Sequence, residues 1–234
     1  MKKYVGAISK FVYGWYINRT FIKEIRGKEN MPPGNFILAS NHASHIDYWL
    51  HGYVLAPRPF TYIGQVDKMT GLMGFLRDAL YAYAEVIPVD RNDRESKKEA
   101  IAKAMEMLKR GYCLIVYPEG ARSRDGRMRE FKPGVARFHL ESGAPVLPVA
   151  TRGTYELMPP GGKLQKEKIV EIIIGKPMGF PLERQMAVEM DKSSPEYYKL
   201  CADVAKRVEE EVRRLLAEIP STKSQITNNT QIPN

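Results

Sequence analysis

The stretch Asn35-Phe36-Ile37-Leu38-Ala39-Ser40-Asn41-His42-Ala43-Ser44-His45-Ile46-Asp47 joins an apolar run of strand character to a polar segment that holds a histidine and an aspartate five positions apart. On one continuous helix this spacing corresponds to about 140° of rotation, so His42 and Asp47 would point to different faces. The two side chains can meet only across a turn. The stretch therefore predicts a strand, a turn and the start of a helix.

Such a turn gives the pair a possible chemical role. If Ser44 or another polar residue caps the helix, the Asp47 carboxylate can accept from one imidazole nitrogen of His42 while the other nitrogen faces a substrate. An imidazole held in one tautomer can take a proton from a hydroxyl group. Alternatively, His42 is a surface or satisfied core histidine and Asp47 only caps the helix. This window alone does not decide between the two interpretations.

Outward from this stretch, strand patterns alternate with helical ones. Strand-like runs occupy residues 35–39, 86–89, 112–117, 145–150 and 168–174, and helical patterns occupy residues 47–56, 67–83, 93–109, 134–142 and 195–218. The helix after Asn92-Asp93 is expected to stop at Gly111, and the last helix to begin at Ser194-Pro195. This alternation predicts an α/β fold with a mostly parallel central sheet flanked by helices.

Length and composition narrow the class of protein. A chain of 234 residues fits one α/β domain or two small ones. Cys113 and Cys201 have no metal-ligand or redox spacing, so we expect two reduced core residues in a cytoplasmic protein. The formal net charge of +9 suits nucleic acid, an anionic membrane surface or a phosphorylated substrate. Zinc-finger spacing and aromatic-basic sheet motifs are missing from the sequence, which argues against nucleic acid.

The chain divides into three segments by composition. Residues 1–26 carry apolar and aromatic residues at helical spacing between lysines and arginines, and are too short and too charged to span a membrane. They predict either a membrane-interfacial helix or a helix packed on the domain, and both remain open. Residues 27–220 form the main domain. Residues 221–234 are polar and aperiodic, and we expect them to be disordered.

Three further segments carry candidate chemistry. The segment Tyr117-Pro118-Glu119-Gly120-Ala121-Arg122-Ser123-Arg124 follows a strand and is rich in charge, at the strand end where α/β sheets bind ligands. Its arginines match phosphate oxygens, although a solvated charged turn would look the same. The run 86–90 ends at Arg91, a second candidate phosphate contact. The run 144–150 contains prolines and predicts an edge or barrel-rim strand.

In order and character these segments resemble the glycerolipid acyltransferase family, in particular the bacterial-type 1-acylglycerol-3-phosphate O-acyltransferases. The four matching blocks are Asn41-His42-x4-Asp47, the segment ending at Arg91, Glu119-Gly120-Ala121-Arg122-Ser123, and Val146-Leu147-Pro148-Val149. The chain departs from the family pattern at two positions. Ala121 stands where the third block usually has threonine, and Glu85 stands where the second block usually opens with glycine.

The resemblance implies transfer of a fatty acyl group from an acyl thioester to the sn-2 hydroxyl of 1-acylglycerol-3-phosphate, which gives phosphatidic acid in phospholipid biosynthesis. His42 would be the general base and Asp47 would orient it. The implied substrate-binding residues are Arg91, Glu119, Gly120, Arg122 and Ser123, with the arginines on the phosphate. No cofactor or metal is implied, and acyl-CoA and acyl-carrier protein remain alternative donors.

The same resemblance implies a peripheral or monotopic enzyme on the cytoplasmic face of the cell membrane, where an anionic surface attracts its positive charge. Two alternatives stay open for the reaction. One is the same chemistry on glycerol-3-phosphate or another lysolipid. The other is a metal-dependent phosphohydrolase built on His42, His45 and Asp47, for which the sequence offers few further ligands.

Overall fold

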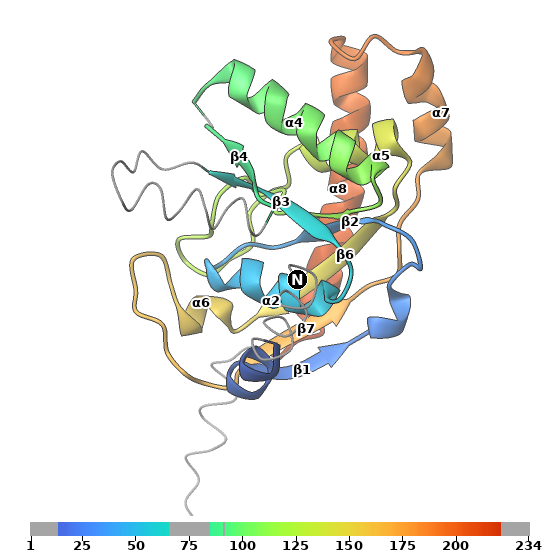
Figure 1. Cartoon of the computed structure of the whole chain (residues 1–234). Coiled ribbons are helices and arrows are strands. Elements are labelled where there is room, and N and C mark those ends of the chain that lie inside the picture. The colour runs from blue at the N-terminus through green and yellow to red at the C-terminus, as the bar shows by residue number, and fades with distance from the viewer. Residues whose placement is uncertain (1–13, 66–84, 91, 221–234) are drawn as a thin grey trace, which may run out of the picture.

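A mixed but mostly parallel sheet forms the centre of the fold in the computed structural model, which describes residues 14–65, 85–90 and 92–220 (Figure 1). Within these residues the sheet has seven strands in the order β1-β7-β6-β2-β5-β3-β4. The strands are β1 (Ile22–Arg26), β2 (Ile37–Ser40), β3 (Phe60–Gln65), β4 (Ile87–Val89), β5 (Cys113–Val116), β6 (Val146–Arg152) and β7 (Val170–Ile174). Every neighbouring pair is parallel except β6 and β7. The predicted fold class is confirmed.

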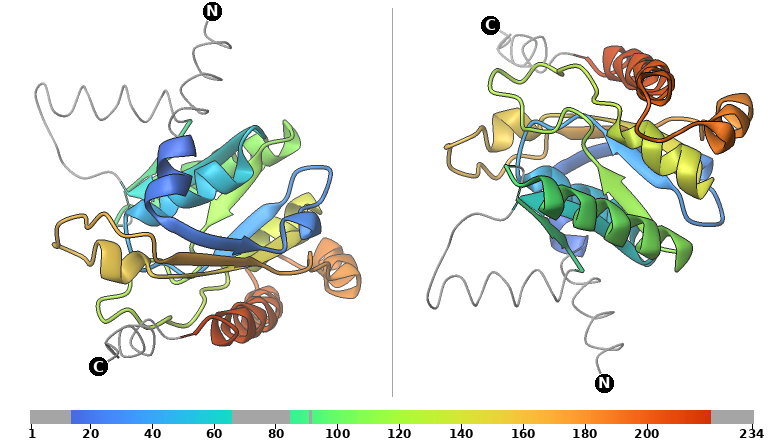
Figure 2. Two further views of the ribbon diagram at one scale, coloured as in Figure 1. Left: turned by 90° about the horizontal axis from the view of Figure 1, so that it is seen from below. Right: turned by 90° about the horizontal axis from the view of Figure 1, so that it is seen from above.

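Helices cover both faces of this sheet (Figure 2). The helices of the described residues are α2 (Ile46–Leu55), α4 (Arg94–Lys109), α5 (Gly134–Ser142), α6 (Thr154–Leu157), α7 (Pro181–Glu189), α8 (Pro195–Ala217), the short 3-10 helix η1 (Lys28–Asn30) and a helical segment at residues 14–20. The helix starts follow the sequence signals. Asp93 accepts from the backbone N–H groups of Glu95 and Ser96, and Ser194 accepts from that of Tyr197. Gly111 has φ 87°, as the predicted helix stop requires.

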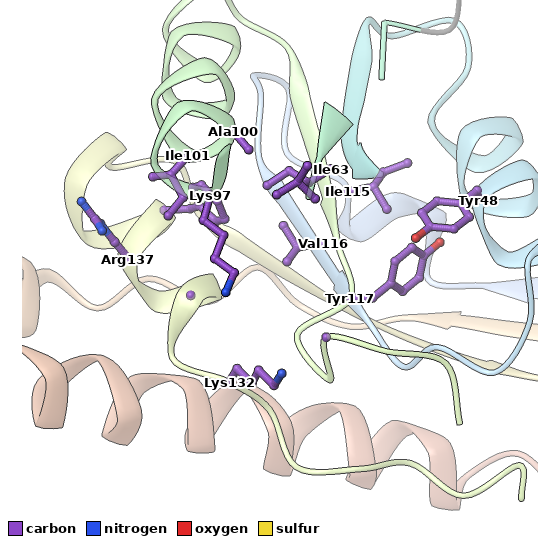
Figure 3. A pocket seen from close by; sticks show the side chains of 14 residues that line it. Tyr48, Ile63, Lys97, Ala100, Ile101, Ile115, Val116, Tyr117, Lys132 and Arg137 are labelled. Carbon is purple, nitrogen blue, oxygen red and sulfur yellow. The ribbon is translucent and has the colours of Figure 1, made fainter. Parts of the chain in front are cut away.

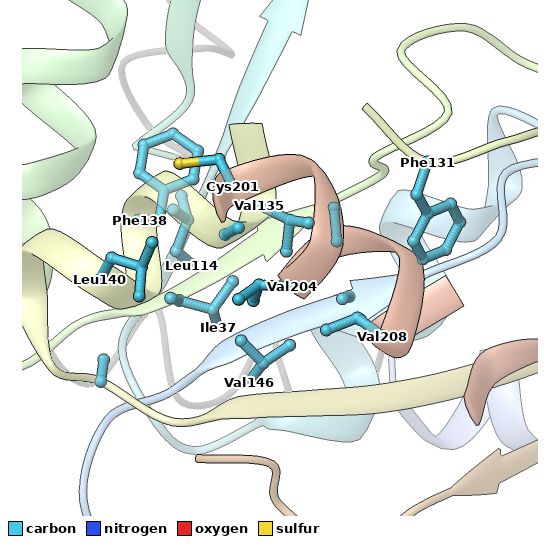
Figure 4. Packing of buried hydrophobic residues seen from close by; sticks show 14 of the residues in the cluster. Ile37, Leu114, Phe131, Val135, Phe138, Leu140, Val146, Cys201, Val204 and Val208 are labelled. Atoms are coloured by element: carbon cyan, nitrogen blue, oxygen red, sulfur yellow. The ribbon is translucent and has the colours of Figure 1, made fainter. Parts of the chain in front are cut away.

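Alternate residues of the strands enter two separate hydrophobic clusters. On one face Ile37, Leu114 and Val146 pack against α4, α5 and α8, where Val204 and Val208 are buried (Figure 4). On the other face the intervening strand residues pack against α2 and the segment 14–20. Because both faces are covered, the central strands are apolar along their whole length. Cys113 and Cys201 are buried and unpaired in these clusters, in agreement with their predicted place in the core.

The fold differs from the sequence prediction at its edges. Residues 22–26, expected to continue the N-terminal helix, form the edge strand β1 and pair in parallel with β7. The chain can turn into this strand because Phe21 and Ile22 are buried against the sheet, whereas a longer helix would expose them. Strand β3 and helix α7 were not predicted. The predicted helix at 67–83, residues 1–13, Arg91 and the tail 221–234 lie outside the described residues.

The prediction of an edge or rim strand at residues 145–150 was wrong. Strand β6 lies inside the sheet, between β2 and β7. Pro148 is tolerated there although it pairs with Ala39 of β2, because its carbonyl and nitrogen face β7, where the antiparallel ladder begins only at Val149. The Pro148 carbonyl still accepts from the Gly175 N–H at 2.9 Å.

Candidate active site

The predicted turn after β2 brings His42 and Asp47 together. The distance from His42 Nδ1 to Asp47 Oδ2 is 2.8 Å, and the backbone N–H groups of Ala43 and Ser44 donate to the same oxygen at 2.9 Å each. Helix α2 begins at Ile46, and Ser44 Oγ accepts from the Ile46 N–H while donating to a distant carbonyl. The carboxylate is therefore fixed by three donors before it meets any substrate.

Electrostatics keep this carboxylate ionised. Burial by itself raises the pKa of Asp47, but the hydrogen bonds from His42 and from the Ser44 N–H lower it, so the pKa of Asp47 lies below its ordinary value. An ionised Asp47 accepts a proton-bearing Nδ1, which leaves the lone pair on His42 Nε2. In the described part of the chain that nitrogen has no hydrogen-bond partner. His42 is only 3% exposed.

The loop after β5 is bonded directly to this turn. Because β2 and β5 are parallel neighbours, both loops leave the same edge of the sheet. Glu119 Oε1 accepts from the His42 N–H at 2.7 Å, and Glu119 Oε2 accepts from the Arg129 N–H at 2.9 Å. The Ser123 N–H donates to the His42 carbonyl at 2.8 Å. The loop is thus bonded to both the N–H and the carbonyl of His42.

The predicted residues of this loop differ in their burial and in the groups that they contact. Glu119 is 1% exposed, and burial raises its pKa to about 7, with the two N–H bonds opposing that effect. Ser123 is also buried, and its hydroxyl donates to Asp125. Gly120 lines a cavity, whereas Arg122 is partly exposed and has no ion pair among the described residues. Glu119 and Ser123 therefore contact protein backbone or loop groups, and Arg122 stays available to a ligand.

Two aromatic residues that the sequence analysis did not select surround His42. The Tyr117 ring stacks on the imidazole with centroids 4.0 Å apart and planes at 18°, and Tyr48 meets it edge-on at 5.1 Å. Tyr117 is the first residue of the predicted segment 117–124, and Tyr48 directly follows Asp47. Their positions beside predicted residues were the only signal of this arrangement in the sequence.

A buried polar network contacts the hydroxyl group of the stacked Tyr117. His51 Nδ1 lies 2.8 Å from the Tyr117 hydroxyl, and His51 Nε2 lies 2.9 Å from Thr151 Oγ1. Burial lowers the pKa of His51 to about 4, so this histidine is neutral at neutral pH. Asn41 joins the ends of β2 and β6 by two hydrogen bonds with the Thr151 backbone, at 2.8 and 2.9 Å. His51 is one helical turn beyond Asp47, a spacing that places both on one face of α2.

A cavity of about 350 Å³ opens next to the stacked tyrosine (Figure 3). Its lining comes from β3, β4, β5, α2, α4, α5 and the loop after β5, and consists of Tyr48, Ile63, Val89, Lys97, Ala100, Ile101, Ile115, Val116, Tyr117, Gly120, Lys132, Gly134, Arg137 and Phe138. Tyr117 contacts both His42 and this space. His42 is not itself a lining residue, so the cavity is connected to the base through the Tyr117 ring.

The alternatives left open by the sequence raise the questions of a metal site and of a membrane-spanning helix. Among residues 14–65, 85–90 and 92–220 no group of three histidine, cysteine or acidic side chains is placed to hold a metal ion. His45 is the exposed N-cap residue of α2, whereas His42 and Asp47 are buried. None of the helices in the same residues is long and apolar enough to cross a bilayer.

Comparison with known proteins agrees with this geometry. The family model described as Acyltransferase matches residues 23–152, which contain His42, Asp47 and the loop of Glu119. The chloroplastic 1-acyl-sn-glycerol-3-phosphate acyltransferase BAT2 of Brassica napus is 32% identical over 162 residues, covering 66% of this chain and 44% of that protein. The Pseudomonas aeruginosa 1-acyl-sn-glycerol-3-phosphate acyltransferase is 28% identical over 209 residues, covering 88% and 73%.

A solved structure is similar along most of the chain. The crystal structure of the 1-acyl-sn-glycerophosphate (LPA) acyltransferase PlsC from Thermotoga maritima has a TM-score of 0.66 and 28% sequence identity, and the match covers 94% of this chain and 80% of that one. The chain spans less than half the length of the chloroplastic relatives from Brassica napus and Arabidopsis thaliana. A family model that covers more than half of the chain, with the histidine and aspartate bonded inside it, establishes that the chain belongs to the acyltransferase family.

Proposed function

We propose that this chain transfers a fatty acyl group from an acyl thioester to the sn-2 hydroxyl of 1-acylglycerol-3-phosphate and so forms phosphatidic acid. The observation that carries the proposal is the His42 imidazole, which has one nitrogen bonded to the ionised Asp47 and the other without a partner among the described residues. The names of the relatives in the plant chloroplast, in Pseudomonas aeruginosa and in Thermotoga maritima support this choice of acceptor.

The proposed chemistry needs one proton acceptor and an activated acyl group. His42 Nε2 takes the proton of the acceptor hydroxyl as its oxygen attacks the thioester carbonyl. The C–S bond of the resulting tetrahedral intermediate then breaks, and the departing thiolate takes the proton back from the imidazolium. Asp47 keeps the imidazole in the productive tautomer and stabilises its positive charge. Both acyl-CoA and acyl-carrier protein present the thioester that this scheme requires.

The residues of the Glu119 loop take two different roles in this proposal. Glu119 and Ser123 act on the base, because their bonds end on the His42 backbone. Gly120 lines the adjoining cavity, and Arg122, together with Arg91, is assigned to the acceptor phosphate. Ala121 has no hydroxyl to add to this set. The loop therefore contributes both positioning residues and substrate contacts.

We also propose that the chain binds peripherally to the cytoplasmic face of an anionic membrane. Trp15 is 60% exposed and Trp49 is 53% exposed, on the segment 14–20 and on α2. These two elements pack together, since a Cβ on Gly14 would lie 2.9 Å from the Tyr53 ring. The Arg19 guanidinium lies 5.9 Å from the Trp15 ring centroid. Exposed tryptophans beside a cation are typical of a surface that enters the headgroup region.

Acyl transfer from labelled acyl-CoA and from acyl-carrier protein to 1-acylglycerol-3-phosphate in anionic vesicles tests the function. We expect product with the wild type and with His45→Ala, and a loss of about 10³-fold or more with His42→Ala, because the loss of a positioned base typically costs that much. Glycerol-3-phosphate and other lysolipids serve as competing acceptors in the same assay.

The His45→Ala variant is the matched control for a metal site. If phosphate release is observed instead of acyl transfer, and if it is lost in His42→Ala and His45→Ala alike and on chelation, the phosphohydrolase alternative replaces the proposal. A folded His42→Ala protein with full acyl transfer would remove the assigned base.

A further inference from the structure

The cavity beside Tyr117 has a positive charge that its own surroundings do not balance. Among the residues that the structure describes, its lining includes Lys97, Lys132 and Arg137 and no carboxylate. Arg137 is bonded to Glu141 at 2.7 Å. Within the described residues Lys97 and Lys132 form no ion pair, so two ammonium groups are available to an anionic ligand.

Apolar side chains form much of the remaining cavity wall. Its apolar members come from the strands β3 to β5 and from the facing sides of α4 and α5, and they are Ile63, Val89, Ala100, Ile101, Ile115, Val116 and Phe138. Figure 3 shows Lys97 and Lys132 on one side of this wall and the rings of Tyr48 and Tyr117 on the other. An apolar wall between the cations and the tyrosines that contact His42 suits an amphiphile that carries a phosphate.

Lys132 is held in place at the loop that positions the base. Its backbone N–H donates to the Pro118 carbonyl at 2.9 Å. Its side chain lies over Gly120, since a Cβ at Gly120 would be 2.7 Å from Lys132 Nζ. Gly120 has φ +72° and directly follows Glu119, whose carboxylate is bonded to the His42 N–H. A ligand bound to Lys132 would therefore be positioned relative to His42 through Gly120 and Glu119.

We propose that Lys97 and Lys132 bind the phosphate of a substrate whose hydrocarbon part lies along the cavity wall. This inference rests on the proposed function and adds two binding residues to it. Two ammonium groups that line one cavity can both form charge-assisted bonds to a bound phosphate. The phosphate belongs either to the acylglycerol-3-phosphate acceptor or to the coenzyme A part of the donor, and steady-state kinetics separates the two.

The test uses Lys97→Met, Lys132→Met and the double variant of the full chain, because methionine keeps the unbranched stem and removes the charge. Lys199→Met on α8 is the matched control, since Lys199 is exposed and also without an ion pair in the described part of the chain. We expect each cavity variant to raise the KM for its phosphate-bearing substrate by about tenfold, with kcat within about twofold, as for the loss of one charge-assisted bond.

The two substrates give distinct outcomes. A higher KM for 1-acylglycerol-3-phosphate alone assigns the phosphate to the acceptor, and a higher KM for acyl-CoA alone assigns it to the donor. KM values for both substrates that equal those of Lys199→Met would overturn the proposal. Lys132→Arg retains the charge, and we expect it to restore most of the affinity, which separates loss of charge from loss of fold.

Binding without turnover keeps this proposal separate from the proposed function. Titration of wild type with a short-chain 1-acylglycerol-3-phosphate, with the matching monoacylglycerol and with coenzyme A measures the preference for phosphate directly. If the wild type prefers a phosphorylated ligand and the double variant loses that preference, the site stands even where no acyl transfer is seen. A preference that the double variant retains would contradict it.

Discussion

The His42 ring is positioned by contacts on its edge, its face and its backbone. Asp47 holds Nδ1, Tyr117 stacks on the ring, and Glu119 and Ser123 bond the backbone N–H and carbonyl. Only Nε2 remains without a partner in the part of the chain that the structure describes. A base restrained in this way loses little rotational freedom when it meets the substrate hydroxyl.

Tyr117 offers a test at the residue scale. Tyr117→Phe keeps the stacked ring but leaves the buried Nδ1 of His51 without its hydroxyl partner, so we expect the free energy of unfolding to fall by about 1–3 kcal/mol. Tyr117→Leu also removes the ring from His42, and we expect kcat to fall by about tenfold or more. Urea unfolding and steady-state kinetics check the two effects. Full kcat in Tyr117→Leu would show that the ring does not position the base.

At the scale of secondary structure, the turn before β4 contains Glu85, one of the two departures from the family pattern. Glu85 has φ 53°, the left-handed conformation that favours glycine, and glycine is the residue usually found at this position of the block. Thr61 Oγ1 donates to the Glu85 carbonyl at 2.6 Å, and the Tyr112 hydroxyl donates to the Glu85 carboxylate at 3.1 Å. These two bonds hold a backbone conformation that glutamate adopts only with strain.

A pair of substitutions tests this strain. We expect Glu85→Gly to change the free energy of unfolding by less than about 1 kcal/mol, because relief of the left-handed strain offsets the greater entropy of the unfolded chain. Glu85→Val should destabilise by about 1–2 kcal/mol, since a β-branched residue fits this conformation worst. Urea unfolding of the three proteins makes the comparison. A glycine variant less stable than the valine variant would contradict the argument.

The strands and helices also show how much of the fold and of the site could be predicted from the sequence. Strand β2, the turn and α4 were predictable because an apolar run, Asp93 and Gly111 act locally. Strand β1 was not, since its sequence Ile22-Lys23-Glu24-Ile25-Arg26 alternates charges as a helix surface does and becomes a strand only by pairing with β7. The His42–Asp47 bond spans five residues and was predicted. The His51–Tyr117 contact spans 66 residues and depends on how α2 packs against the sheet.

For the whole molecule, the Glu119 loop predicts a dependence of stability on pH. Burial raises the pKa of Glu119 from 4.5 to about 7, so the folded state binds a proton there that the unfolded state releases. The stabilisation that proton binding at Glu119 contributes to the folded state is complete below pH 4.5 and is lost as the pH rises through about 7. Relative to Glu119→Gln, which does not titrate, the wild type should lose about 3 kcal/mol of unfolding free energy over this range.

Urea unfolding of both proteins between pH 4 and 8 measures this difference. His51 titrates in both, so its contribution cancels in the comparison. A wild type that gains stability over Glu119→Gln as pH rises would show that the two backbone N–H bonds favour the carboxylate more strongly than burial opposes it.

The whole molecule also determines how membrane binding has to be tested. Deleting residues 1–26 would remove β1 along with the helical segment, so a loss of binding could not be separated from damage to the sheet. Point substitutions avoid this. The double variant Trp15→Ala and Trp49→Ala removes the two exposed rings on one face and should lower partition into anionic vesicles by about tenfold or more.

Tyr198→Ala is the matched control for this surface. Tyr198 is 64% exposed on α8, which covers the opposite face of the sheet from α2, so its loss should leave partition unchanged. Co-sedimentation with vesicles at low and high salt measures both effects, and salt should weaken binding because the surface is anionic. If the double tryptophan variant binds as the wild type does, or if Tyr198→Ala weakens binding equally, the face formed by residues 14–20 and α2 is not the membrane surface.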